Sequence, residues 1–140
     1  MSVEFFVDTN VFIYQLEGLD ERKKRIADNI VEAAFGNGCI SFQVVQECLN
    51  ITMRKAEVPL GAGDAQRYLD HVLRPLWRVM PSVQLYRNSI GIQARYQYGF
   101  YDSVIIAAAQ EAGCKRLLTE DMQSGQRIDG LIIENPFMVS

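Results

Sequence analysis

Short apolar runs alternate with longer amphipathic segments along this chain of 140 residues. The short runs are rich in β-branched and aromatic residues and are bounded by turn-forming residues, a pattern typical of buried strands. We therefore predict strands over residues 4–7, 39–41, 77–80, 116–119 and 131–134.

The longer segments have apolar positions at helical spacing, polar residues at their starts, and Gly or Pro at their ends. They predict helices from Asp20 to about Phe35, from Phe42 to about Glu57, from about Gly63 to Leu73 before Pro75, from the N-cap Ser82 to about Tyr98, and from the N-cap Asp102 to near Gly113, with a short helical turn after Asp8. Strands that alternate with helices need crossover connections. The fold class is therefore α/β, with a mainly parallel sheet covered by helices on both faces.

Composition places the chain among ordinary globular proteins and predicts a single domain over residues 1–140. Hydrophobic residues make up 49% and charged residues 22%, and the net charge of −3 neither indicates nor excludes a nucleic-acid partner.

Cys39, Cys48 and Cys114 lack metal-binding spacing and are interpreted as core residues in a reducing compartment. Without a signal peptide or a long apolar run, we expect a cytoplasmic protein with no membrane partner.

Two aspartates follow predicted strands directly. Asp8 ends the first strand, and Asp121 comes just after the strand over residues 116–119. In parallel sheets the ligand crevice lies beyond the carboxyl ends of the strands, so both side chains are expected there. Each also has an ordinary structural interpretation, as a helix cap for Asp8 and as a turn residue for Asp121.

Two further acids belong to predicted helices. On a helical wheel Glu47 lies about 40° beyond Ile51, at the rim of the apolar face, although a solvated glutamate fits the same position. Asp102 begins a helix whose residues 103–109 carry no charge, so it enters a largely buried element. Capping explains part of this placement, and a bound cation would explain the burial.

Together the four acids predict a site for a hard divalent ion, because Mg²⁺ and Mn²⁺ prefer carboxylate and water oxygens. His71 is the sole histidine and belongs to an amphipathic helix, where a surface or interhelix role is the usual one. Nucleophilic triad chemistry therefore has little support. A phosphatase or receiver domain of similar α/β build would need acidic pairs that the segment DTN after the first strand does not supply.

The ordered segments FFVDTN, VVQECLN, YDSVIIAAA and LLTEDM, with a closing strand before NPF, resemble the PIN-domain family over essentially the whole chain. The resemblance implies a three-layer α/β/α PIN-like domain. It also implies that Asp8, Glu47, Asp102 and Asp121 are the catalytic and metal-binding acids, and that Thr9, Asn10 and Thr119 orient them through hydrogen bonds. Ser103 departs from the alanine common in the family. Glu120 adjoins Asp121, so it either shares the metal or shifts the register of the motif by one residue.

Within that family the chain looks most like the VapC-type toxins of VapBC toxin–antitoxin pairs. This likeness implies an endoribonuclease dependent on Mg²⁺ or Mn²⁺, with RNA as substrate, a cognate antitoxin as partner, and a homodimer. Arg54 and Lys55 follow Glu47 on the same helix and are candidates for RNA contact, and Tyr96, Tyr98, Phe100 and Tyr101 either stack on bases or belong to the core. A stand-alone RNA-processing nuclease and a non-catalytic binding module remain as alternatives.

Overall fold

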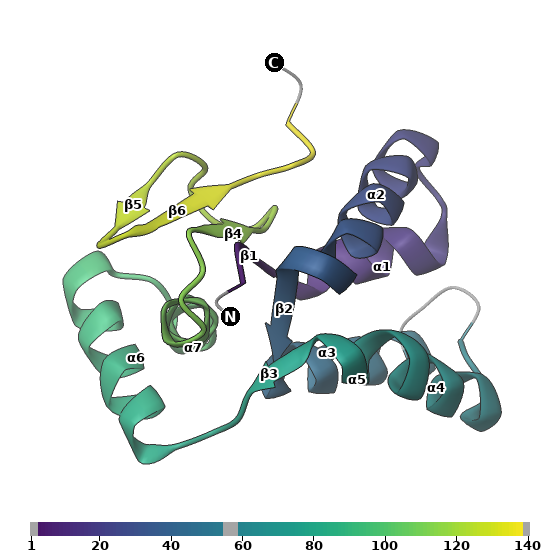
Figure 1. Cartoon of the computed structure of the whole chain (residues 1–140), viewed down its shortest axis with the longest axis horizontal. Coiled ribbons are helices and arrows are strands. Elements are labelled where there is room, and N and C mark those ends of the chain that lie inside the picture. Colours follow the sequence, from purple (N-terminus) through teal and green to yellow (C-terminus); the bar gives the residue numbers. More distant parts are fainter. Residues whose placement is uncertain (1–2, 55–58, 139–140) are drawn as a thin grey trace.

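The computed structural model describes residues 3–54 and 59–138, and a six-stranded sheet forms the centre of this part of the chain (Figure 1). In the order β3-β2-β1-β4-β6-β5, neighbouring strands are parallel except for the antiparallel pair β5 and β6. The strands are β1 (Phe5–Val7), β2 (Gly38–Ser41), β3 (Trp77–Val79), β4 (Arg116–Leu118), β5 (Arg127–Ile128) and β6 (Leu131–Glu134). The predicted mainly parallel sheet is thus confirmed.

Strand β1 lies in the middle of the sheet, and all three of its residues are buried. Phe6 pairs with Cys39 of β2 on one side and with Leu117 of β4 on the other. A strand covered on both faces needs an unbroken apolar run, and the sequence supplies one. Just beyond β1 and β4, the backbone N–H of Asp8 donates a 3.0 Å hydrogen bond to the carbonyl of Leu118, which fixes the start of the following loop beside β4.

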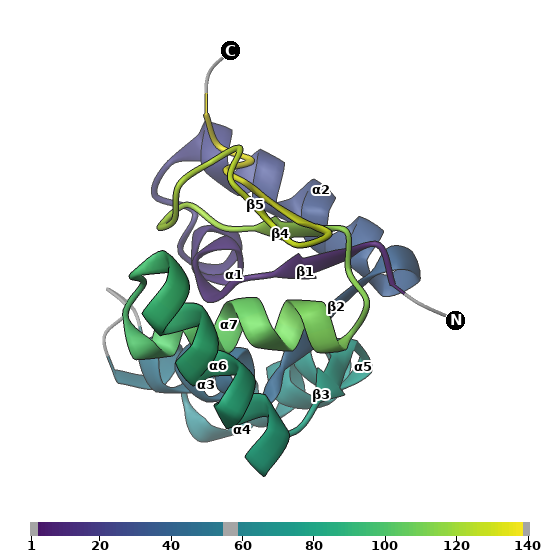
Figure 2. The same ribbon diagram turned by 90° about the vertical axis from the view of Figure 1, so that its left-hand side faces the viewer.

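Helices cover both faces of the sheet and complete three layers (Figures 1 and 2). Helices α1 and α2 lie on one face, α7 lies on the other with α6 outside it, and α3, α4, η1 and α5 surround the edge formed by β2 and β3. Their bounds are α1 (Thr9–Glu17), α2 (Glu21–Asn37), α3 (Phe42–Arg54), α4 (Ala62–Tyr68), the π-helix η1 (Leu69–Leu73), α5 (Arg74–Leu76), α6 (Val83–Tyr96) and α7 (Phe100–Glu111).

Local cap chemistry sets the start of two helices as predicted. The side chain of Asp20 accepts a hydrogen bond from the N–H of Lys23 at the start of α2, and Ser82 accepts one from Leu85 at the start of α6. These caps satisfy backbone donors that have no partner within the helix.

Several predicted boundaries are wrong. The helical turn after Asp8 is the nine-residue helix α1. Helix α7 begins at Phe100 with Gly99 as its N-cap, so Asp102 lies inside the first turn and is not the cap. Pro75 does not end the preceding helix, because the π-helix η1 leads directly into α5 and the helical backbone continues to Leu76. The predicted end of α3 near Glu57 lies outside the described residues.

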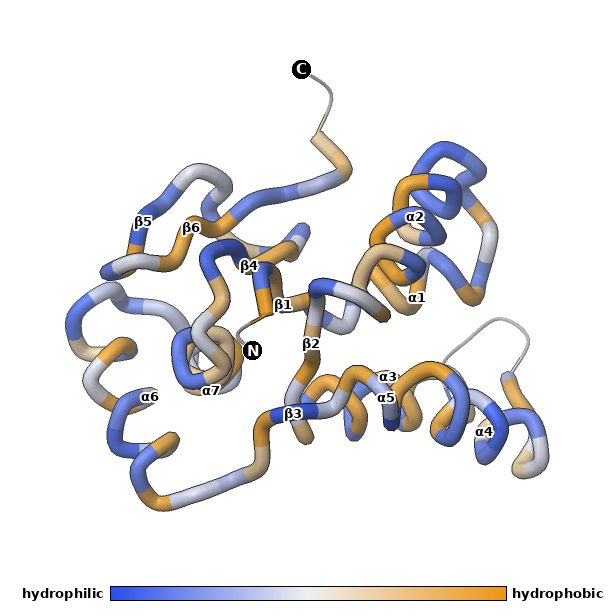
Figure 3. Tube along the Cα trace, viewed as in Figure 1, coloured by the Kyte–Doolittle hydropathy of each residue, from blue (hydrophilic) through white to orange (hydrophobic). Residues whose placement is uncertain are grey.

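The apolar core is continuous around the sheet, and orange segments of the hydropathy trace meet there (Figure 3). Residues 103–109 of α7 are all buried, as the uncharged sequence of this helix predicts. The three cysteines are buried and free, which agrees with their interpretation as core residues. Within the described chain, no helix combines the length and the apolar character needed to cross a bilayer. The assignment of residues 1–140 to a single domain stays a prediction.

Candidate active site

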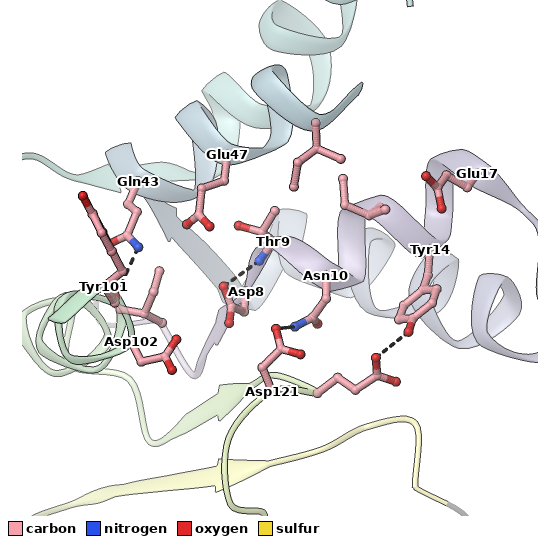
Figure 4. A pocket seen from close by; sticks show the side chains of 14 residues that line it. Asp8, Thr9, Asn10, Tyr14, Glu17, Gln43, Glu47, Tyr101, Asp102 and Asp121 are labelled. Carbon is pink, nitrogen blue, oxygen red and sulfur yellow. Dashed lines mark hydrogen bonds between the residues drawn. The ribbon is translucent and has the colours of Figure 1, made fainter. Parts of the chain in front are cut away.

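The four predicted acids line one pocket of about 420 Å³ beyond the carboxyl end of the central strands (Figure 4). Asp8 follows β1, Glu47 lies on α3, Asp102 lies in the first turn of α7, and Asp121 follows β4. Residues far apart in sequence are therefore brought together, as the sheet topology requires. Over residues 3–54 and 59–138, however, no three of these carboxylates are close enough to enclose a cation as they stand.

Asp8 is the most deeply buried of the four, with 6% of its surface exposed. Its Oδ1 accepts a 2.7 Å hydrogen bond from the backbone N–H of Thr9, and its Oδ2 accepts one of 2.8 Å from the hydroxyl of Thr119. Burial raises the pKa of Asp8 to about 7, and the nearby charges of Glu47 and Asp121 add to the rise. The two hydrogen bonds oppose this effect and hold the carboxylate in one orientation.

The hydroxyl of Thr119 links three parts of the site. Besides donating to Asp8, it accepts hydrogen bonds from the backbone N–H of Asp121 at 3.2 Å and from Nδ2 of Asn10 at 3.3 Å. A hydroxyl has one donor and two acceptor positions, so its capacity is fully used. Nδ2 of Asn10 also donates to Oδ2 of Asp121 at 3.1 Å. The DTN and TED segments are thus tied together at the bottom of the pocket.

Glu47 and Asp102 face the same pocket from opposite sides (Figure 4). Burial raises the pKa of Glu47, the nearby side chains of Gln43 and Thr9 oppose the rise, and the charges of Asp102 and Asp121 add to it. The pKa of Asp102 is also raised, first by burial and then by the charge of Asp121. These shifts have a common cause, because partly desolvated like charges disfavour one another's ionised forms.

Several buried oxygens at the pocket have no hydrogen-bond partner among the described residues. They are Oε1 of Glu47, Oδ1 of Asn10, Oγ1 of Thr9 and Oε1 of Gln43. A buried acceptor without a donor costs about 1–3 kcal/mol, so such groups are usually satisfied by a bound species. Oxygen acceptors beside mutually repelling carboxylates are the donor set that Mg²⁺ or Mn²⁺ prefers, so the residues fit such an ion.

Comparison with known proteins agrees with this geometry. The family model described as PIN domain matches residues 5–129. The chain belongs to the PIN-domain family. No curated protein matches the chain at the sequence level.

Solved structures share the PIN fold with this chain at low sequence identity. A toxin–antitoxin complex from Klebsiella pneumoniae has a TM-score of 0.72 at 19% identity, covering 97% of this chain and all of the other. DNA-bound VapBC from Salmonella typhimurium has a TM-score of 0.66 at 22% identity, covering 96% and 98% of the two chains. A sarcin–ricin loop cleaving VapC toxin of Mycobacterium tuberculosis has a TM-score of 0.62 at 16% identity, covering 81% and 87%. At these identities the likeness concerns the fold.

In this PIN domain Glu120 and its neighbour Asp121 have different hydrogen-bond partners. Its carboxylate accepts hydrogen bonds from the hydroxyl of Tyr14 and, at 2.6 Å, from Nζ of Lys23. Burial raises the pKa of Glu120, but the hydrogen bonds from Lys23 and Tyr14 outweigh it and hold the pKa below its usual range. Asp121, by contrast, is bonded to Asn10, so the acid two residues after Thr119 is the one that joins the cluster.

The pocket of the PIN domain also contains residues that the sequence did not single out, chiefly Gln43 and Tyr14. Gln43 precedes Glu47 by four residues and so shares its helix face, a signal that was present in the sequence.

Tyr101 also lines the pocket and is 74% exposed, which excludes a core role. Arg54 is exposed at the end of α3 and does not line the pocket, and Lys55 lies outside the described residues.

Proposed function

We propose that this PIN domain is a metal-dependent endoribonuclease that hydrolyses RNA phosphodiester bonds. The observation that carries the proposal is the convergence of Asp8, Glu47, Asp102 and Asp121 from four separate segments on one pocket. The pKa values of Asp8, Glu47 and Asp102 are raised by burial and by neighbouring negative charges, and such an arrangement costs free energy in the absence of a cation, so fold stability does not explain it. Membership of the PIN-domain family supports the same reaction class.

The proposed ion is Mg²⁺ or Mn²⁺, held by Asp8, Asp102 and Asp121 with Glu47 beside them. When bound, such an ion supplies charge neutralisation on the phosphate oxygens and lowers the pKa of water for attack on phosphorus.

The chain's own residues position the reacting groups. The hydroxyl of Thr119 and the N–H of Thr9 hold both oxygens of Asp8, and Asn10 holds Asp121. Oε1 of Glu47 is buried and lacks a donor within the described part of the chain, so it is available to accept a hydrogen bond from the attacking water and to orient it. Arg54 lies beyond Ile51 on α3, and we propose that it and Lys55 contact phosphates further along the RNA.

We further infer that the chain is the toxin of a toxin–antitoxin pair. The support is the likeness in fold to complexes that are toxin–antitoxin pairs, in several organisms and over nearly the full length of the chain. The proposal includes a cognate antitoxin as partner and a homodimer as the assembly. A stand-alone RNA-processing nuclease differs in having no co-expressed inhibitor, so a tight complex with the product of a neighbouring small gene distinguishes the two.

The test of the ribonuclease proposal is a cleavage assay on labelled structured and single-stranded RNA, with Mn²⁺ or Mg²⁺ and then with EDTA. Wild type is compared with Asp8→Asn and Asp102→Asn, and with Asp28→Asn as a matched control, since Asp28 pairs with Lys24 on the surface of α2. Cleavage is expected in wild type and the control with metal, and in neither pocket variant. Cleavage that persists in the pocket variants would indicate contamination, and none with any metal would favour a binding module.

A further inference from the structure

A second cavity, of about 230 Å³, adjoins the acidic pocket between α3, α6 and the start of α7. Four aromatic residues contribute to its lining: Phe42, Tyr86, Phe100 and Tyr101. Gln43 and Tyr101 line both cavities, so a ligand chain can pass from one to the other without leaving the surface. What binds in the second cavity is therefore held next to the four acids.

The aromatic side chains of this cavity are unusually open to solvent. Tyr101 is 74% exposed, Phe100 38% and Tyr86 37%. The rings of Tyr86 and Phe100 are stacked, with centroids 6.3 Å apart and planes inclined by 23°, and the ring of Tyr101 meets that of Phe100 edge-on at 5.6 Å. Phe42, Tyr96 and Tyr98 pack against the core, whereas Tyr86, Phe100 and Tyr101 are exposed. Exposed flat rings beside a site are suited to stacking on another flat ring.

Gln43 supplies an independent sign of a ligand at the border of the two cavities. Only 6% of the surface of this residue is exposed, and its Nε2 donates a 3.2 Å hydrogen bond to the carbonyl of Tyr101. That bond fixes the amide plane, and Oε1 is left buried without a partner in the part of the chain that the structure describes. An oriented, desolvated acceptor calls for a donor such as the amino or imino group of a base.

We propose that this aromatic cavity binds an unpaired base of the RNA, one that flanks the scissile phosphate. The base stacks on the cluster formed by Tyr86, Phe100 and Tyr101 and donates a hydrogen bond to Oε1 of Gln43. The inference rests on the proposed ribonuclease function and adds to it the residues that would hold one unpaired base beside the acids. Such bases occur in loops and single strands, whereas a base within a duplex cannot reach the cavity.

The cavity has consequences for how substrates bind. Stacking of one base on aromatic side chains contributes roughly a ten- to hundredfold gain in affinity. Because the cavity lies to one side of the acids, this gain in affinity should come from the base of one nucleotide, at a fixed number of positions from the scissile phosphate. The acceptor at Oε1 of Gln43 adds a preference for bases that present a donor at that edge.

The experiment measures binding of a short labelled single-stranded RNA, and of copies that each lack one base, by fluorescence anisotropy in EDTA at low salt. Wild type is compared with Tyr86→Ala and Phe100→Ala. Ile90→Ala is the matched control, because Ile90 is an exposed residue one turn after Tyr86 on α6 that does not line the cavity. We expect one position at which loss of the base weakens binding to wild type and to the control by roughly ten- to hundredfold, but changes binding to the two aromatic variants much less.

The possible results separate this inference from the ribonuclease proposal. Equal effects of base loss in wild type and Tyr86→Ala would overturn the base site, and RNA cleavage with metal would still stand. No binding of RNA at all would overturn the base site as well. If Tyr86→Ala changes the mass of the protein in solution while RNA binding is unaltered, the face belongs to an interface with a second copy, and the inference is wrong. Absence of cleavage alone leaves the binding result intact.

Discussion

Without metal, the protein should become less stable as pH rises through the range from about 4 to 7, and Asp8 should account for a large part of the loss. The pKa of Asp8 is raised from its ordinary value of 3.8 to about 7, first because the carboxyl is buried. Between these two values the folded state holds a proton that the unfolded state has released. Raising the pH removes that proton from the folded state, so the free energy of unfolding must fall.

The size of the effect follows from the same shift. Each unit of pKa difference corresponds to about 1.36 kcal/mol, so the two units between about pH 5 and the folded-state pKa of about 7 give roughly 3 kcal/mol. Domains of this size have total stabilities of about 5–15 kcal/mol. A change of this size moves a urea midpoint by about 1–3 M, because typical slopes are about 1–3 kcal/mol per M.

The assay is urea unfolding in EDTA at about pH 5 and about pH 8, for wild type and for Asp8→Asn. Asparagine keeps the shape of the side chain and does not titrate, so the variant should lose much of the pH dependence and be the more stable protein at the higher pH. Asp28→Asn is the surface control and should follow wild type. Equal pH dependence in wild type and Asp8→Asn, or a wild type that gains stability with pH, would refute the reasoning.

Adding Mg²⁺ or Mn²⁺ should reverse the trend in wild type. Metal binds the deprotonated carboxylates and competes with protons for them, so its stabilising effect should be larger at about pH 8 than at about pH 5. The Asp8→Asn variant should gain much less. A metal effect that is the same in both proteins and at both pH values would place the ion elsewhere on the molecule.

Two further predictions concern the support of the site and of the sheet. Thr119→Val removes the hydroxyl that joins the DTN and TED segments and should lower stability by about 1.5–3 kcal/mol along with RNA cleavage. Thr119→Ser keeps the hydroxyl and should retain most of both. Full stability and cleavage in Thr119→Val, or comparable losses in the two variants, would contradict the role given to the hydroxyl. Gly38→Ala should lower stability by about 1–3 kcal/mol in urea unfolding, because its β-carbon would lie 2.8 Å from side-chain carbons of α2 and β1. The matched change Gly36→Ala, which meets nothing within 4 Å in the described chain, should be neutral or slightly stabilising, and a similar loss at both positions would contradict the steric argument.

The parts of the fold that the sequence predicts well are those specified by local chemistry. Asp20 and Ser82 each supply a side-chain acceptor at a helix start, and the structure shows both bonds. Strand β1 is an unbroken apolar run because it is buried on both faces of the sheet. Such signals depend on a few adjacent residues, so they can be recognised without knowledge of the tertiary structure.

The parts that the sequence did not predict depend on distant partners. Strand β5 has two residues, Arg127 and Ile128, and exists because it pairs with β6. Nothing in so short a segment distinguishes it from a turn. Helix α7 starts two residues before Asp102, because the backbone of Gly99 serves as its cap and the aspartate faces the pocket instead.

The candidate site shows the same division. Asp8 and Asp121 could be predicted to meet because both follow parallel strands that end at the same edge of the sheet. Glu47 and Asp102 lie on helices, and the resemblance to the PIN-domain family was needed to join them to the same site. The pairing of Glu120 with Lys23 was not predictable, since the two residues are 97 positions apart and meet through the packing of α2 beside the loop after β4. Gln43 was recognisable from its helix face, but its role depends on the carbonyl of Tyr101, which comes from another element.

This difference between Glu120 and Asp121 bears on the chemistry of the whole site. Of two adjacent carboxylates, one has a lysine 2.6 Å away and a lowered pKa, whereas the other is bonded to a neutral amide and raises the pKa values of Asp8, Glu47 and Asp102. The fold thus supplies a cation for Glu120, which lines the same pocket, whereas no salt bridge among the described residues involves the other four acids, so their mutual repulsion is uncompensated. A divalent ion would remove that repulsion and so stabilise the same arrangement that binds it. Folding and metal binding should therefore be linked in this protein, and the pH and metal titrations of Asp8→Asn measure that link directly.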